Sequence, residues 1–243
     1  MEPEWITPAW PAPPRVHALT TTRTGGFSAA PYDGFNLGDH VGDSAEAVAA
    51  NRRLLRERLA LPVEPLWLRQ VHGCAVATDG QAASPCADAA VTDRPGVVCA
   101  VLSADCLPLF LCDRAGSRVG IVHAGWRGLA DGVIESALDA MGVAGEELLC
   151  WLGPAIGPSA FEVGEEVREA FLRRDMAAET AFRPSANGRW LADLYRLARQ
   201  RLETRGVSAV GGGGHCTFTE RERFFSYRRD GASGRMASLI WME

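Results

Sequence analysis

The chain has 243 residues, of which 47% are hydrophobic and 23% charged, and its formal net charge at pH 7 is −5. This acidic balance argues against nucleic acid as a partner, because a nucleic-acid-binding surface needs basic groups to displace phosphate counterions. No apolar stretch approaches the roughly 20 residues that a membrane helix needs, so no membrane partner is expected either.

The N-terminal residues and the cysteines both indicate a reducing compartment. Glu2 and Glu4 lie near the start of the chain without a basic cluster beside them, unlike the pattern of a secretory signal peptide. The seven cysteines form no repeated short spacing, and an odd number suits free thiols better than a disulfide framework. We therefore expect a cytoplasmic protein.

The first predicted elements are one helix and three strands. Residues 43–60 are expected to form a helix, because Asp43 can cap it, Glu46 follows three residues later, and apolar residues recur at helical spacing. Three apolar runs bounded by Gly or Pro are typical of buried strands. They cover residues 65–72, 96–106 and 118–125.

Further along the chain, predicted helices and strands are mixed. A helix over residues 129–141 has one apolar face and a stop signal at Gly142. The glycine-rich segment 211–216 is expected to be a flexible loop, and its His215 and Cys216 are too close together to chelate one metal easily. The remaining elements are a strand at 148–153, helices at 164–176 and 191–204, and a closing strand at 236–242.

This mixture predicts an α/β (α+β) fold class, with layers of helix and sheet. We expect a single layered domain over residues 1–243, in which a mixed β-sheet is flanked by helices. Residues 1–16 form a proline-rich lead to it.

Three residues lie at the same type of position, at or just past the end of a strand-like run: His72, Cys106 and His123. Two imidazoles and a thiolate are good zinc ligands, and a catalytic zinc needs three protein ligands. Gln70 and Asp105 are candidates to orient a ligand or move a proton. Each of the three also has an ordinary structural alternative, as a buried thiol or a hydrogen-bonded histidine.

Arginines next to glycine-rich turns are candidate anion-binding groups. Arg127 opens a helix after Gly125, Arg23 lies in "TTRTGGFS", and Arg228 and Arg229 belong to the basic cluster "SYRRDGASGR", which suits a small anion. The alternatives are a plain strand-to-helix turn at Gly125 and ordinary surface arginines.

Several common motifs are missing from the sequence. It has no H-x-E paired with P-C-x-x-C, no P-loop, no G-x-S-x-G and no H-E-x-x-H. It has only five histidines, too few for a multicopper oxidase, since one blue-copper centre already takes two histidines and a cysteine.

A series of longer motifs resembles the YfiH family, also called the multicopper polyphenol oxidase or laccase-domain family. The similarity runs in order from about Thr20 to the C-terminus. The motifs are "TTRTGGFS", "YDGFNLGDHVGD", "LRQVHG", "ADAAVTDRPG", "SADCLPLFL", "VHAGWRGLA", "GPAIGPSAFEVGEEV" and "CTFTERERFFSYRRDGASGRMASLIW".

The resemblance implies a layered α/β domain and a metal site formed by His72, Cys106 and His123. It also implies purine nucleoside phosphorylase activity on adenosine, inosine, guanosine and methylthioadenosine, together with adenosine deaminase activity. Some members are linked to the editing of peptidoglycan precursors.

We therefore expect a zinc-dependent enzyme, with copper as the alternative metal and with Cys106, His123 and Asp105 as the catalytic residues. Purine nucleosides and phosphate are the expected partners. The substrate-binding candidates are Arg23, Arg127 and Arg228 for phosphate and Asn36 and Gln70 for the nucleoside.

Three alternatives stay open. Cys106 could be the nucleophile and His123 the base of a hydrolase that edits peptidoglycan precursors. The chain could instead be a copper-dependent polyphenol oxidase, or a protein that binds metal without turnover.

Overall fold

The computed structural model describes residues 2–78 and 84–243. One of its two large sheets has five strands in the order β1-β2-β14-β6-β3, all antiparallel except the β6–β3 pair. Its bounds are β1 Trp5–Ile6, β2 Val16–Thr21, β3 Leu66–Trp67, β6 Cys99–Ser103 and β14 Met236–Met242. The long strand β14, from the end of the chain, lies in the middle of this sheet and pairs with both β2 and β6.

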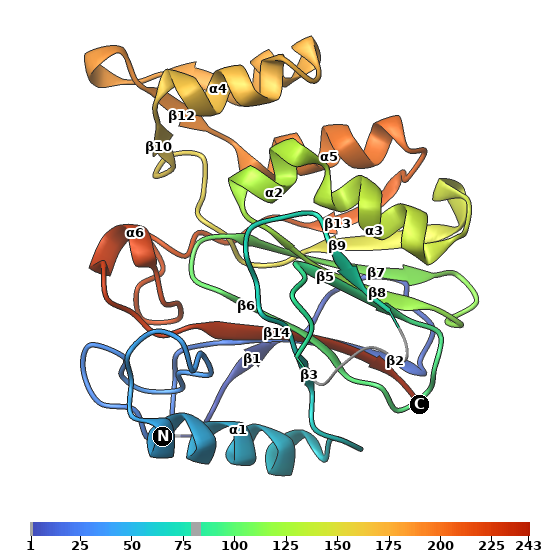
Figure 1. Cartoon of the computed structure of the whole chain (residues 1–243), viewed down its shortest axis with the longest axis vertical. Helices are drawn as coiled ribbons and strands as arrows, with labels where there is room; N and C mark the ends of the chain where they lie inside the picture. The colour runs from blue at the N-terminus through green and yellow to red at the C-terminus, as the bar shows by residue number, and fades with distance from the viewer. Residues whose placement is uncertain (1, 79–83) are drawn as a thin grey trace.

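The second large sheet has six strands in the order β13-β9-β7-β8-β5-β4, with parallel pairs at its two ends. Its bounds are β4 Val76–Ala77, β5 Ala89–Thr92, β7 Leu107–Asp113, β8 Val119–Ala124, β9 Leu148–Leu152 and β13 Ala209–Gly212. The two sheets face each other across one apolar layer, to which Val101, Phe110, Trp151 and Ile240 contribute. Figure 1 shows them stacked in the middle of the molecule.

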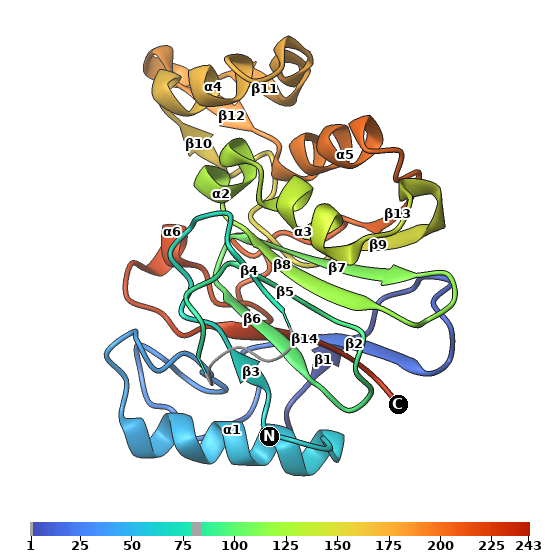
Figure 2. The same ribbon diagram turned by 45° about the vertical axis from the view of Figure 1, so that its right-hand side comes forward.

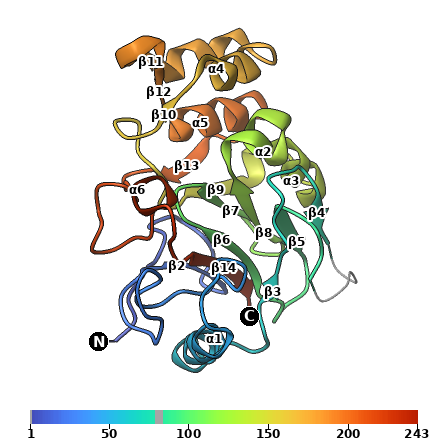
Figure 3. The same ribbon diagram turned by 60° about the vertical axis from the view of Figure 1, so that its left-hand side comes forward.

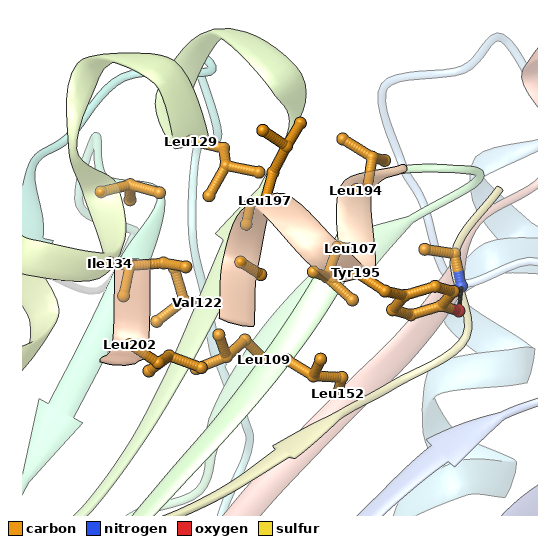
Figure 4. Packing of buried hydrophobic residues seen from close by; sticks show 14 of the residues in the cluster. Leu107, Leu109, Val122, Leu129, Ile134, Leu152, Leu194, Tyr195, Leu197 and Leu202 are labelled. Atoms are coloured by element: carbon orange, nitrogen blue, oxygen red, sulfur yellow. Dashed lines mark hydrogen bonds between the residues drawn. The ribbon is translucent and has the colours of Figure 1, made fainter. Parts of the chain in front are cut away.

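Helices cover the outer faces of both sheets. Helix α1 (Ala45–Leu59) packs on the five-stranded sheet, and α2 (Trp126–Asp131), α3 (Val133–Met141) and α5 (Leu194–Thr204) pack on the six-stranded sheet. Figure 4 shows this second layer, where Leu197 and Leu202 of α5 meet Leu109 and Val122 of the sheet. Burying such side chains contributes about 1.5–3 kcal/mol each.

A smaller unit projects beyond α2 and α5 (Figure 1). It consists of an antiparallel sheet in the order β10-β12-β11 and of α4. The bounds are β10 Glu162–Val163, α4 Glu165–Leu172, β11 Phe182–Pro184 and β12 Trp190–Ala192. The short helix α6 (Tyr227–Asp230) and three 3-10 helices complete the described elements: Gly145–Glu147, Met176–Ala181 and Ala186–Gly188.

The α/β fold class is confirmed, but the helix layers enclose two large sheets instead of one. The predicted helix 129–141 is two helices, because Gly132 adopts φ 107° and ends α2 before α3 begins. The first helix starts at Ala45 with Ser44 as its cap. Asp43 was expected to cap it, but one of its carboxylate oxygens accepts from the Asn36 amide (2.8 Å) and the other from the Ser44 N–H (2.8 Å).

Other predicted boundaries are also corrected. Of the predicted strand 65–72, only Leu66–Trp67 pairs, and the residues after it form the loop that carries His72. The expected helix 164–176 ends at Leu172, because Asp175 caps a new 3-10 helix. The expected helix 191–204 begins at Leu194, because Trp190–Ala192 form β12. The glycine-rich segment 211–216 is partly ordered in β13, which includes its first two residues.

The proline-rich lead packs on the body of the protein. Trp5 and Ile6 pair with β2, and Ile6, Trp10 and Ala12 pack against the layer between the two large sheets. No helix of the described residues is long and apolar enough to span a membrane.

The strand directions bring several chain segments to one edge of the two sheets. Strands β6, β8 and β9 end there, and β5, β7 and β14 begin there, as their pairings require. Figures 2 and 3 show this edge beside α6 from two directions. Residues that follow β6 and β8, or that precede β5 and β14, therefore meet although they are distant in sequence.

A buried ion pair links α3 to α5 and gives a stability prediction. Arg201 Nη1 donates to Glu135 Oε1 (3.0 Å), and the two side chains are only 9% and 16% exposed. Since Arg201→Met leaves a buried carboxylate without its partner, the free energy of unfolding should fall by about 3 kcal/mol, measured by urea denaturation. Arg173→Met, at an exposed pair with Glu169, should change it by less than about 1 kcal/mol. Equal effects of the two variants would contradict the prediction.

Candidate metal centre

His123 lies at the end of β8 and is held by one acidic residue. Its backbone N–H donates to the carbonyl oxygen of Asp88 (2.7 Å), and its Nδ1 lies 2.9 Å from Asp88 Oδ1. Both side chains are buried, with exposures of 4% and 0%. Because Nδ1 is engaged by the carboxylate, Nε2 is the ring nitrogen left to bind a metal.

The same carboxylate also fixes the loop that carries His72. The backbone N–H groups of Val71, His72 and Gly73 donate to Asp88 at 3.1, 2.9 and 2.8 Å. His72 has φ 59°, in the left-handed region that a side chain rarely adopts, so these bonds stabilise an unfavourable turn. Asp88 thus positions both histidines. Burial alone would raise its pKa, but the hydrogen bonds from His123 and the backbone hold that pKa below its ordinary value.

Gln70 ties the start of this loop to β6. Its amide nitrogen donates to Leu102 O (2.8 Å), and its amide oxygen accepts from Leu102 N (2.7 Å). Both ends of the amide are therefore used in aligning the loop with the sheet.

Cys106 follows β6 through a strained residue. Asp105 has φ 91°, and its buried carboxylate accepts from the Thr217 hydroxyl (2.6 Å) and from the Arg228 backbone N–H (2.7 Å). The Asp105 carbonyl oxygen accepts from Ile156 N (3.0 Å). Asp105 therefore joins three distant segments and sets the direction in which Cys106 leaves the sheet.

The three predicted ligands come together. One donor atom each from His72, Cys106 and His123 lies within 4.8 Å of the others, and the three residues are respectively exposed, half-buried and buried. The two imidazole rings are 4.9 Å apart, edge to face. Gly125 closes the cluster, because a Cβ atom there would lie 2.6 Å from His72 Nδ1 and 3.1 Å from Cys106 Sγ. Only glycine leaves this space open.

The thiol and the imidazole of this cluster shift each other's ionisation. Burial by itself raises the pKa of Cys106, but the charge and hydrogen bonds of His123 and His72 outweigh burial and lower the pKa to about 6. Burial by itself lowers the pKa of His123, but the Cys106 thiolate and Asp88 outweigh it and raise the pKa to about 9. Between about pH 6 and pH 9, Cys106 is therefore a thiolate and His123 is an imidazolium. A metal that binds His123 would displace its proton.

The donor chemistry fits a catalytic metal site. Two imidazoles and a thiolate are three ligands of the kind that zinc and copper accept, and a carboxylate orients one of the histidines from behind. His72 is exposed, so the cluster opens to solvent on one side.

The other predicted binding residues lie in different settings. Arg23 is engaged with Asp33, to whose carbonyl oxygen and carboxylate it donates at 2.8 and 3.2 Å. Asn36 is fully buried. Its amide nitrogen donates to the Asp43 carboxylate, and its amide oxygen accepts from the backbone N–H groups of Gly38 and Arg235. The amide therefore has no surface to offer a nucleoside.

Arg127 and Arg228 are exposed. Arg127 lies in the first turn of α2 and stacks over Trp126 at 4.4 Å from the ring centre. Arg228 lies in α6, donates to Glu162 O (2.6 Å) and stacks over Phe161 at 5.3 Å. It thereby ties the projecting unit to the edge that carries Cys106.

Sequence reasoning missed two residues that the structure brings to this edge. Asp88 directly precedes the buried run 89–92, and an acidic residue at the start of a strand was its only local signal. Arg235 is the last residue of "SYRRDGASGR", so the basic cluster was noticed but this arginine was not singled out.

The thiolate gives a pH prediction for the metal-free protein. Alkylation of Cys106 by iodoacetamide should rise with a midpoint near pH 6, because the thiolate is the reactive form and its pKa is lowered to about 6. Mass spectrometry of the Cys106 peptide measures the rate. His123→Ala removes the positive charge and should move the midpoint up towards the ordinary thiol value of about 8.5. A midpoint above pH 8 in the unaltered protein would contradict the ion pair.

The fold and the three donors together define a layered α/β protein with a candidate His–Cys–His metal centre at one edge of its two large sheets. Residues 17–243 match the family described as multi-copper polyphenol oxidoreductase laccase. The chain belongs to this family, which confirms the resemblance seen in its motifs.

Its relatives include named enzymes. The chain is 57% identical over 240 residues to a purine nucleoside phosphorylase of Pseudomonas aeruginosa, with 98% of each chain covered. It is 52% identical over 239 residues to purine nucleoside phosphorylase YfiH of Escherichia coli, again with 98% of each covered.

Solved structures of similar proteins have the same fold. Protein NMB0706 of Neisseria meningitidis matches with a TM-score of 0.94 at 50% identity, covering 98% of this chain and 99% of the other. YlmD of Geobacillus stearothermophilus matches with a TM-score of 0.91 at 33% identity, covering 98% and 96%.

Proposed function

We propose that the chain is a zinc-dependent purine nucleoside phosphorylase that acts on adenosine, inosine, guanosine and methylthioadenosine, with adenosine deaminase activity in addition. The observation that carries the proposal is the 57% identity, over nearly the full length of both chains, to a protein named purine nucleoside phosphorylase. The His–Cys–His cluster supports it, because it supplies a place for a catalytic metal.

Phosphorolysis sets the chemical requirements of such a site. The bond from C1′ of the sugar to the purine nitrogen breaks, and a bond from C1′ to a phosphate oxygen forms. The bonding electrons leave with the purine, which takes up a proton, so positive charge builds on the sugar and negative charge on the base. The protein must hold an anion, position the nucleoside and stabilise the departing base.

His72, Cys106 and His123 are the residues that would hold zinc, with copper as the alternative. When bound, the metal would supply a Lewis-acidic positive charge beside the reacting groups, which both phosphorolysis and hydrolytic deamination can use. The chain's own contribution is the fixed geometry of the ligands: Asp88 keeps the His123 ring in place, and Asp105 sets the position of Cys106.

Arg127 and Arg228 are the proposed contacts to substrate at the solvent-facing side of the cluster, since both residues are exposed. Arg23 would act at an open cleft that Arg221 and Arg223 also line. Gln70 and Asn36 serve the substrate indirectly, Gln70 through the loop of His72 and Asn36 through the backbone of Arg235.

We also propose that the chain works as a single domain in the cytoplasm on small-molecule substrates, with neither nucleic acid nor membrane as a partner. The net charge of −5 supports the exclusion of nucleic acid, because a nucleic-acid-binding surface needs basic groups.

A Cys–His hydrolase is the second candidate function. The pairing of the Cys106 thiolate with His123 favours it, because an activated thiolate can attack a carbonyl carbon without a metal. Four-copper oxidase chemistry is less well supported by the donor set, since the described residues hold one cluster of three ligands.

Product analysis separates these functions. Purified protein is incubated with adenosine and with inosine, with and without phosphate, and free base, sugar phosphate and deaminated product are separated by chromatography. Phosphate-dependent release of base together with sugar 1-phosphate is the expected result. Unchanged nucleosides would rule out the proposed phosphorylase and direct the search to muropeptide and phenolic substrates.

A further inference from the structure

Arg235 lies at the same edge of the sheets as Cys106. It directly precedes β14, whose first residue, Met236, pairs with Ser103 in β6. The chain continues past the end of β6 from Ser103 to Cys106, and β14 runs the opposite way, so the antiparallel register places Arg235 beside the segment that contains the thiol. The backbone N–H of Arg235 donates to Asn36 Oδ1 (2.9 Å), which fixes its position.

The Arg235 side chain is half-buried, and its guanidinium group lies over the Tyr227 ring, 5.9 Å from the ring centre. Its Nη1 donates to Ser233 O (2.8 Å) and Gly234 O (3.0 Å). Within the described ranges, residues 2–78 and 84–243, no hydrogen bond or ion pair engages its Nε or Nη2. Gly38 flanks the stem, because a Cβ atom there would lie 2.8 Å from Arg235 Cγ. One edge of the guanidinium fork is therefore held while the other is available.

The charges around Arg235 connect it to the metal centre. Burial lowers its pKa, and the negative charges of Cys106 and Asp105 oppose that shift. The arginine charge also contributes, after burial, to lowering the pKa of His40. Two other arginines that are half-buried or buried have a carboxylate partner: Arg52 pairs with Asp39 at 3.3 Å, and Arg201 pairs with Glu135 at 3.0 Å. The half-buried Arg199 has none among the described residues, but both of its Nη atoms donate to carbonyl oxygens, Nη1 to Val210 O and Nη2 to Gly212 O (2.9 Å each).

A partly desolvated guanidinium without a carboxylate is costly unless an anion neutralises it. Its planar fork matches a tetrahedral oxyanion, to which it can donate two parallel hydrogen bonds. We infer that Arg235 is the residue that binds the phosphate oxyanion next to the Cys106 ligand, an inference that rests on the proposed phosphorylase function. Arg127 and Arg228, which are exposed, then contact the substrate farther from Cys106 than Arg235 does.

Direct titration of inorganic phosphate tests the assignment without requiring turnover. Phosphate is titrated calorimetrically into the metal-loaded protein and into Arg235→Gln, with and without hypoxanthine. Arg235→Gln should bind phosphate at least about ten-fold more weakly, because it loses a charge-assisted bidentate pair. In a separate activity assay, the Michaelis constant for inosine should change by less than about three-fold in this variant. The control is Arg118→Gln, since Arg118 lies at the opposite end of β8, bonded to Met141 O (2.8 Å), and should keep full phosphate affinity.

Each outcome decides the assignment. A weakened phosphate affinity in Arg235→Gln alone supports it, even if no nucleoside is cleaved, in which case only the phosphorylase function fails. No phosphate binding by the unaltered protein, or equal affinity in Arg235→Gln, overturns it, even if phosphorolysis is observed. Should Arg235→Gln not fold, Arg235→Lys decides, because lysine keeps the charge but not the fork. Weaker binding in Arg235→Lys supports the assignment, and unchanged binding overturns it.

Discussion

Replacing Cys106 by alanine is expected to remove both the bound metal and the phosphorolysis of inosine. The thiolate is one of three donors within 4.8 Å, and the two imidazoles that remain are too few for a catalytic zinc site. Changes behind a metal ligand already weaken metal binding about 10–100-fold, so loss of the ligand itself should exceed about 100-fold. Elemental analysis of the purified variant and chromatographic detection of hypoxanthine measure the two losses.

The matched control is Cys216→Ala, another half-buried thiol, which accepts a hydrogen bond from Gly157 N (3.2 Å) and is not part of the cluster. It should keep metal and activity. If Cys106→Ala retains both, the metal centre is placed wrongly. If it loses activity while the unaltered protein contains no metal, Cys106 acts as a nucleophile, as in the Cys–His alternative.

Asp88→Asn should cause the second-largest loss. The carboxylate accepts from three backbone N–H groups and faces His123 Nδ1. An asparagine has only one acceptor oxygen, and its NH₂ group is a donor that would be turned towards other donors. Metal affinity should fall about 10–100-fold, because His123 loses the partner that fixes its ring. The free energy of unfolding of the metal-free protein should fall by about 1–3 kcal/mol, because part-buried backbone N–H groups lose their acceptor.

Asp113→Asn separates these two effects. Asp113 is also buried and accepts from Ser117 N (2.7 Å) and Arg118 N (3.0 Å), but it lies at the far end of β7. This variant should lose stability in urea denaturation yet bind metal normally in a competition titration with a chelator. Comparable metal affinity in Asp88→Asn and Asp113→Asn would show that Asp88 does not orient a ligand.

The sequence was sufficient to single out the three candidate metal ligands that the structure brings together, for a definable reason. Each of them lies at or just past the end of an apolar run in the sequence, the kind of position where ligand sites gather in open α/β sheets. The residues that orient these ligands could not be predicted in the same way. Asp88 acts through backbone N–H groups 15–17 residues away, and no local pattern specifies such a pairing.

Local sequence patterns also could not predict that the strands divide into two sheets. β14 pairs with β2, and the Ser238–Thr20 hydroxyl contact of 2.7 Å spans 218 residues. Apolar runs predict buried strands but not which strands are neighbours, so one sheet and two facing sheets give the same pattern. The break between α2 and α3, by contrast, had a local signal in Gly132, a residue that weakens any helix.

Metal removal and restoration provide the most direct test that metal at His72, Cys106 and His123 supports phosphorolysis. Protein treated with a chelator is checked for metal by elemental analysis, and phosphate-dependent release of hypoxanthine from inosine is then measured before and after zinc is returned. We expect turnover to fall to background and to recover when about one zinc is bound per chain. Full phosphorolysis by the metal-free protein would contradict a metal-dependent phosphorylase.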